Sequence, residues 1–120
     1  MKTGRKISGG KYHRRRKKRL HERAGQPKTV KLGPEKRKIL KGKGGNKKAV
    51  LLTSDVVNLK TKSGKSQKVK IKNVLETPSN RFLARQNILV KSAIIETDAG
   101  KARITNRPSE EGNVQAVLIE

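Results

Sequence analysis

Ala93-Ile94-Ile95-Glu96-Thr97-Asp98-Ala99-Gly100-Lys101-Ala102-Arg103-Ile104-Thr105-Asn106 is the stretch that decides the fold class. Its first five residues form an apolar run of strand length. Its last six alternate, so that Ala102 and Ile104 are expected to face inward and the cations outward. Residues 98–100, which end in glycine, are expected to form a three-residue hairpin loop closed by a bulge. The stretch therefore predicts an antiparallel hairpin.

Further short strands are expected on both sides of this hairpin. The clearest covers residues 67–77, where Val69, Ile71 and Asn73 are expected to face one way and alternate lysines the other. The remaining expected elements are strands at residues 28–32, 36–41, 49–53, 55–59, 87–90 and 114–119, a helix at 81–86 with Phe82 and Leu83 inward, and an acidic loop at 109–113. Short strands separated by turn residues are typical of a small antiparallel β-barrel or a sandwich. We predict the barrel, with one short helix and a long basic N-terminal extension.

The N-terminal segment differs in composition from the rest of the chain. Within residues 1–26, Ile7 and Leu20 are the only large aliphatic residues, and residues 11–19 carry seven Lys or Arg and no acid. Such a segment cannot bury enough apolar surface to offset the entropy of ordering it. We therefore predict a flexible basic extension over residues 1–26, followed by a β-barrel body over residues 27–120.

The charge of the chain indicates its class of partner. The net charge is +23, and residues 1–48 hold 20 of the 32 Lys and Arg but only 2 of the 9 acids. A nucleic acid is the leading partner, because Lys and Arg release condensed counterions when they neutralise phosphates. An anionic membrane surface is less favoured, since the basic run lacks the large apolar residues that would lie in the interface. An acidic protein is the third class. With one Phe, one Tyr and no Trp, base stacking is not expected to be a major mode of binding.

The sequence carries no pattern of enzyme chemistry. Gly64-Lys65-Ser66 ends like a phosphate-binding P-loop, but the first glycine of that motif would fall at position 59, which is Leu59. His13 and His21 have no carboxylate or thiol that would complete a metal site, and the chain has no cysteine. We expect no catalytic residue, metal, cofactor or small-molecule substrate.

The candidate nucleic-acid-binding residues are all cations. They are Arg5, Lys6, Lys11, Arg14, Arg15, Arg16, Lys17, Lys18, Arg19, Arg23, Lys43, Lys47, Lys48, Lys68, Lys70, Lys72, Arg81 and Arg85. The glycine-rich residues 42–46 are interpreted as a hairpin loop that requires unusual φ angles, and their amides could also contact phosphate. Alternate residues on one face of a strand lie roughly 6.6 Å apart, so the lysines within residues 67–77 form either a phosphate-tracking ridge or a solvated outer face.

Several motifs together resemble one protein family. They are Gly4-Arg5-Lys6-Ile7-Ser8-Gly9-Gly10, Gly44-Gly45-Asn46, Asn80-Arg81 with Asn87-Ile88, residues 93–97 and 100–105, Arg107-Pro108, Gly112-Asn113-Val114, and residues 116–120. Over its whole length the chain resembles the ribosomal protein S8e family, the archaeal and eukaryotic type of small-subunit ribosomal protein eight. Its length, without the large internal insertion of the eukaryotic members, is typical of the archaeal branch.

The resemblance implies a function and its partners. The family is a β-barrel body with a basic N-terminal extension that binds small-subunit ribosomal RNA beside neighbouring small-subunit ribosomal proteins, in the small ribosomal subunit of the cytoplasm. A structural constituent of that subunit is therefore expected. The alternatives are an assembly factor of the same superfamily that binds precursor ribosomal RNA, and a DNA-compacting protein. No membrane partner is expected.

Overall fold

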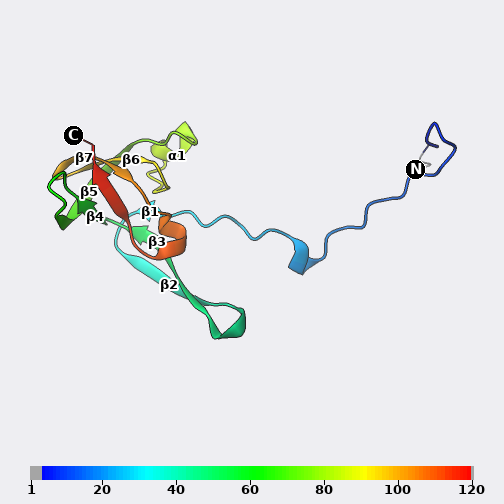
Figure 1. The fold of residues 1–120 in the computed structure, drawn as a ribbon, viewed down its shortest axis with the longest axis horizontal. Coiled ribbons are helices and arrows are strands. Elements are labelled where there is room, and N and C mark those ends of the chain that lie inside the picture. Colours follow the sequence, from blue (N-terminus) through cyan, green and yellow to red (C-terminus); the bar gives the residue numbers. More distant parts are fainter. Residues whose placement is uncertain (1–3, 120) are drawn as a thin grey trace.

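A computed structural model describes residues 4–119 as a β-rich body with an elongated N-terminal segment (Figure 1). Its extents are 69 × 36 × 25 Å and its radius of gyration is 21.1 Å, whereas a compact chain of this length has about 14 Å. Residues 1–3 of the predicted extension and residue 120 of the predicted body lie outside the described residues. No helix within residues 4–119 is long and apolar enough to cross a membrane.

A closed five-stranded barrel forms the main part of the body. Its strands follow one another around the barrel in chain order: β4 (Val56–Lys60), β5 (Ser66–Glu76), β6 (Ile94–Thr97), β7 (Gly100–Ile104) and β8 (Gln115–Leu118). Successive strands pair antiparallel, but β4 and β8 close the barrel by pairing parallel. The barrel is therefore mixed, and the prediction of an antiparallel barrel is wrong on this point. An odd number of strands that alternate in direction must leave one parallel pair where the ring closes.

A second, three-stranded sheet lies beside the barrel. Its order is β1 (Lys31–Leu32), β3 (Lys47–Ser54) and β2 (Lys36–Lys41). β1 pairs parallel with β3, and β2 pairs antiparallel with β3. The outer ends of β2 and β3 form a two-stranded ribbon that projects from the body (Figure 1). The predicted body is thus a barrel plus a separate sheet.

Two short α-helices complete the described body, one more than the sequence predicted. α1 (Arg81–Arg85) lies against β5, and α2 (Pro108–Glu111) packs on β3. The region of α2 was expected to be a loop. Three features explain the helix: proline at its first turn, two acids in that turn and Gly112 in the left-handed conformation after its end.

One hydrophobic core fills the barrel and continues under the three-stranded sheet. Val57, Leu59, Ile95, Ala102 and Ile104 have no exposed surface. Val30, Leu51 and Leu89 belong to the same cluster. The two sheets therefore share a single core, although they do not share strands.

The hairpin on which the fold prediction rests is present as β6 and β7. Ala102 and Ile104 are buried, and Lys101 and Arg103 are exposed, as predicted. The loop differs from the prediction: Thr97 pairs with Gly100, so only two residues lie between the strands. Gly100 has φ 122°, a backbone angle that residues with a Cβ seldom adopt.

Two other expectations about strands fail. β5 shifts register between Ile71 and Asn73, and a bulge reverses the face on which the following residues lie. As a result Asn73 is exposed, contrary to the prediction, and Val74 is buried in its place. Residues 87–90 are not a strand: Ile88 is buried, but it makes only an isolated bridge to Lys31.

Candidate nucleic-acid interface

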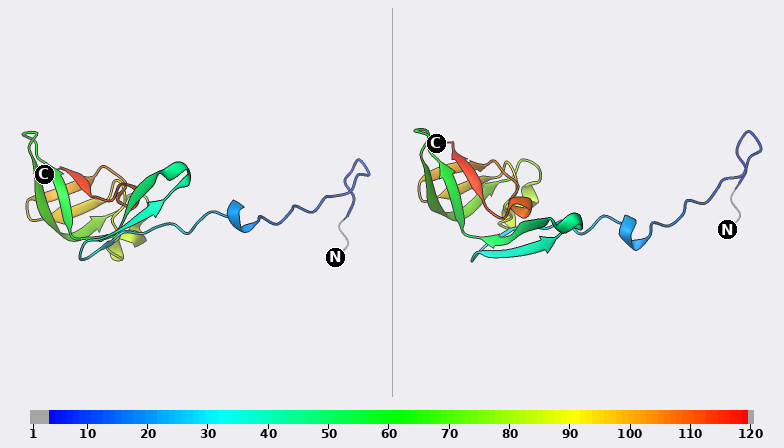
Figure 2. Two further views of the ribbon diagram at one scale, coloured as in Figure 1. Left: turned by 90° about the horizontal axis from the view of Figure 1, so that it is seen from below. Right: turned by 60° about the horizontal axis from the view of Figure 1, so that its bottom comes forward.

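The N-terminal segment is exposed along its length. Every residue from Gly4 to Thr29 is exposed, and Figure 2 shows this segment running away from the body. Val30 is the first buried residue, and its carbonyl accepts the Leu89 N–H at 2.8 Å. The segment is therefore anchored to the core at Val30, while its cations are in solvent.

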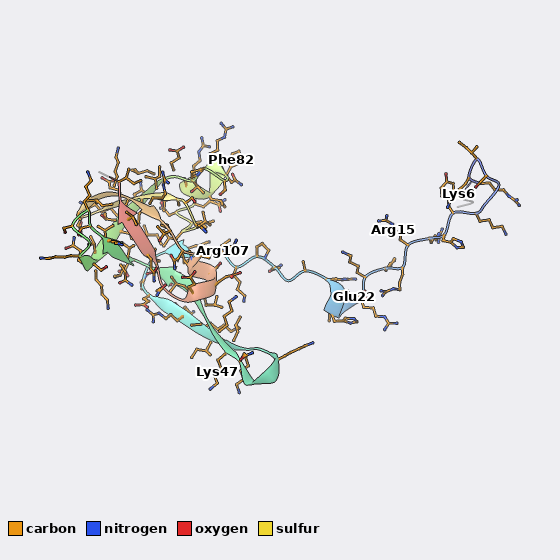
Figure 3. The ribbon with its side chains drawn as sticks, viewed as in Figure 1. Lys6, Arg15, Glu22, Lys47, Phe82 and Arg107 are labelled. Carbon is orange, nitrogen blue, oxygen red and sulfur yellow. The ribbon has the colours of Figure 1, made fainter. Side chains whose placement is uncertain are left out.

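The far end of the segment forms a small loop. Arg5 and Lys11 make an antiparallel bridge, and the Lys6 N–H donates to the Gly10 carbonyl at 2.9 Å. Gly9 has φ 79°, which the turn requires. The Lys6 ammonium lies 5.7 Å from the centre of the Tyr12 ring, within cation–π range. This loop (Figure 3) presents cations that come from both sides of the turn.

A second local structure is the turn η1 (Leu20–Glu22), which depends on the only acid in the first 30 residues. The Arg16 guanidinium donates to both Glu22 carboxylate oxygens, at 2.9 and 2.7 Å, and the Arg19 backbone N–H donates to one of them at 2.9 Å. The Arg16 hydrogen bonds, followed by that of the Arg19 backbone, lower the pKa of Glu22 below its ordinary value. Glu22 therefore holds one tight turn within the basic segment.

The β2–β3 ribbon carries an unusual concentration of lysine. Lys41 lies directly opposite Lys47 across the two strands, a like-charge pair that destabilises the hairpin. Between them η2 (Lys43–Gly45) turns through Gly44 and Gly45, at φ 70° and 78°. Lys48 is partly neutralised, because its ammonium lies 3.4 Å from the Glu110 carboxylate. Figure 3 shows Lys47 at the outer end of the ribbon.

Sequence reasoning missed four cations of this ribbon. They are Lys36, Arg37, Lys38 and Lys41, all exposed on β2. The sequence carried a signal for them, namely cations at consecutive positions of a predicted strand. Because successive side chains of a strand point to opposite faces, such a strand must have solvent on both faces. Arg37 pairs with Glu35.

The predicted lysine ridge is present on β5. Lys68 and Lys70 are exposed on the same face of the strand, and Lys72 follows them at the bulge. The Lys72 ammonium lies 3.3 Å from the Asp98 carboxylate, which belongs to the β6–β7 loop. Lys68 and Lys70 form no ion pair within residues 4–119. At the two ends of the ridge, the charge of Lys72 is therefore partly neutralised by Asp98, whereas that of Lys68 is not.

Helix α1 presents its side chains differently from the prediction. Its N-terminus is capped by Asn80, whose Oδ1 accepts the Phe82 N–H at 2.9 Å. Leu83 and Ala84 are half-buried, but Phe82 is 54 % exposed, so its predicted place in the core is wrong. A five-residue helix can turn only one narrow face to the body, and Leu83 and Ala84 occupy that face. The Arg81 guanidinium instead lies 5.5 Å from the centre of the Phe82 ring.

All eighteen predicted site residues are exposed, but they form four separate groups. These are the N-terminal segment, the ribbon end, the β5 ridge and α1. One end of the ridge lies near α1, because Asn73, which follows Lys72, lines the same pocket as Arg81 and Arg85. The ribbon and the N-terminal segment leave the body in the same general direction (Figures 1 and 2). Within the described residues no three His, Cys, Asp or Glu side chains gather as a metal site would require.

Comparison with known proteins identifies the family. The family model described as Ribosomal protein S8e matches residues 1–119. The small ribosomal subunit protein eS8 of Methanocella arvoryzae is 43 % identical, over 98 % of this chain and 95 % of its own length. The eS8 proteins of Methanocorpusculum labreanum and Methanosarcina barkeri are 41 % and 40 % identical, over 99 % and 97 % of this chain and 96 % and 94 % of their own lengths. These relatives are archaeal, as the length of the chain predicted, and the chain belongs to the ribosomal protein S8e family.

Proposed function

We propose that this protein is a structural constituent of the small ribosomal subunit, which binds and stabilises folded small-subunit ribosomal RNA. The observation that carries the proposal is the elongated, exposed N-terminal segment. Within residues 4–29 it contains many cations and a single acid, Glu22. Its relatives bear the name of a small ribosomal subunit protein. The proposed location is the cytoplasmic ribosome, and the proposed neighbours are ribosomal RNA and other small-subunit proteins.

The mechanism is electrostatic and structural. Phosphates of RNA helices that approach one another repel, and Lys or Arg placed between them replaces mobile counterions with fixed ones. Double-stranded RNA offers side chains mainly phosphates and 2′-hydroxyls, so the segment would recognise shape more than sequence. The chemistry needs no reacting group, in keeping with a family of structural rather than catalytic proteins.

The body has a distinct part in this mechanism. We assign residues 1–26 to the RNA-binding extension and residues 27–120 to the body that holds it. The buried Val30 and its hydrogen bond to Leu89 support this division, because they attach the segment to the core just after its last exposed residues. The ribbon and the β5 ridge then supply further cations at fixed positions.

A chemical footprint on small-subunit RNA tests the proposal. The full-length protein should protect discrete RNA sites that survive an excess of transfer RNA. Protection that transfer RNA removes entirely would contradict the proposal, and so would a preference for duplex DNA over ribosomal RNA at physiological salt.

The alternative is an assembly factor that binds precursor ribosomal RNA and then leaves. The family name favours a resident protein. Quantitative mass spectrometry of purified particles separates the two functions. A resident protein should be near-equimolar with other proteins in mature small subunits, whereas enrichment in precursors alone would indicate the assembly factor.

A further inference from the structure

We propose that α1 and the bulged part of β5 form a binding site for one unpaired nucleobase of an RNA strand. The inference rests on the proposed function and names a local ligand for it. Its starting point is Phe82 on α1, the only phenylalanine of the chain, which is 54 % exposed. Leu75 on β5, which lines the pocket described next, is 41 % exposed. A flat aromatic face in solvent next to a basic surface has the properties of a base-stacking platform.

A pocket of about 340 Å³ separates the helix from the strand. Its lining comes from Arg81, Ala84 and Arg85 of α1, from Asn87 just after the helix, and from residues 73–75 of β5. The residues around it include no carboxylate. The Arg81 guanidinium also lies over the Phe82 ring, so the aromatic face and the pocket are joined by one planar cation.

The two asparagines supply free hydrogen-bond donors. The Val74 N–H donates to Asn73 Oδ1 at 2.9 Å and to Asn87 Oδ1 at 3.4 Å. This leaves both side-chain NH₂ groups without an acceptor in the described part of the chain. Asn87 is held at φ 52°, an uncommon angle for a residue with a side chain. Donors at this position suit the ring-nitrogen and carbonyl acceptors on the edge of a base.

The chemistry of the pocket selects its occupant. A nucleotide has a planar base with apolar faces, a polar edge and an anionic phosphate, and the site offers an aromatic ring, amide donors and two arginines for these three parts. A protein partner would need a larger apolar surface, but only Phe82 and Leu75 are exposed apolar side chains here. Arg81 and Arg85 form no ion pair within residues 4–119, so both are free for a phosphate. One such site does not make stacking the main mode of binding.

A comparison of two oligonucleotides tests the site. The probes are an oligoadenylate of about six nucleotides and an abasic ribose-phosphate chain of equal length, each titrated with the full-length protein. Because both carry the same phosphates, the ratio of their affinities reports the base alone. We expect about tenfold tighter binding of the oligoadenylate. Phe82→Leu should reduce the ratio to about one with the abasic affinity unchanged, while Phe82→Tyr, which keeps the ring, should retain the ratio.

Val117→Ala provides the control, since Val117 on β8 is an apolar side chain that is 42 % exposed and lies outside the pocket. Val117→Ala should leave the ratio near its original value. The proposal is overturned if the unmodified protein binds both probes equally, if the ratio survives Phe82→Leu, or if Val117→Ala abolishes it.

A photo-cross-linker at position 82 distinguishes RNA from protein as the occupant. The full-length protein with p-benzoylphenylalanine in place of Phe82 is incorporated into small subunits and irradiated. Cross-linking to ribosomal RNA supports the base site, and cross-linking only to a ribosomal protein, or to nothing, overturns it. If the protein does not enter small subunits at all, the proposed function fails, and the oligonucleotide ratio still tests the base site independently.

Discussion

Gly112 has no room for a side chain where the end of α2 packs on β3. It follows α2 at φ 71°, and a Cβ on it would lie 2.9 Å from the Ala49 Cβ on β3. Gly112→Ala should lower the free energy of unfolding by about 2–4 kcal/mol, because a left-handed conformation and an overpacked contact add. Urea denaturation of the two proteins measures this loss.

Gly64→Ala is the matched control for that prediction. Gly64 has φ 82°, but no atom outside residues 63–65 would lie within 4 Å of an added Cβ. Gly64→Ala should lower the free energy of unfolding only by the cost of the left-handed conformation, about 1–2 kcal/mol. Equal losses for the two variants would show that α2 does not press on β3.

At the residue scale, sequence reasoning succeeds where alternation is unbroken and fails where a local irregularity intervenes. Ala102 and Ile104 lie on the predicted face, because no bulge interrupts β7. Asn73 and Val74 exchange faces, because the bulge in β5 adds one residue that no local pattern predicts. The apolar character of Phe82 and its place between two arginines predict an inward side chain, yet the short helix leaves it outside.

At the scale of elements, the β2–β3 ribbon is destabilised by its own charge when no partner is bound. Lys41→Glu would replace the like-charge pair with Lys47 by an opposite pair. It should stabilise the free protein by up to about 1 kcal/mol and yet weaken RNA binding, because a phosphate contact is lost and a repulsion gained. Thermal denaturation and RNA titration measure the two effects. Lys41→Gln should give intermediate values, and RNA affinity that Lys41→Glu leaves unchanged would show that the ribbon does not contact RNA.

The turn at Glu22 should depend on pH. Its folded-state pKa is depressed below 4.5 by Arg16 and the Arg19 backbone. The turn is therefore fully stabilised above the ordinary pKa and is lost as the pH falls through the lowered one. An NMR titration of the Glu22 carboxyl carbon should give a midpoint below 4.5, and Arg16→Gln should move it back toward that value. A midpoint at or above the ordinary value in the unmodified protein would contradict the Arg16–Glu22 interaction.

Most strands could be predicted from the sequence, but the arrangement of the strands could not. Residues 36–41 and the strands around the 93–106 hairpin follow local patterns of apolar residues and turns. The parallel pairing of β4 with β8 joins segments far apart in the chain, so no local pattern encodes it. Helix α2 was missed although its proline, its acids and the glycine after it are all helix-end signals, because the same residues are also common in loops.

On the scale of the whole molecule, charge and shape act together. The core is small and lies at one end, while the cations extend along a segment that makes the chain far longer than a compact domain of its size. Composition alone predicted the polyanionic partner and the exposed segment. The places of the ribbon and the ridge relative to the core required the fold, because they depend on how strands far apart in the chain pair.

The salt dependence of RNA binding tests most directly the claim that the N-terminal segment is a fixed counterion of ribosomal RNA. In the variant to be compared, Gln replaces the six cations of residues 14–19. Its log–log slope of affinity against salt should be flatter by up to about 4–5, since each phosphate contact contributes roughly 0.7–0.9. The far-UV circular dichroism of the body should be nearly unchanged. A slope equal to that of the unmodified protein would contradict the account.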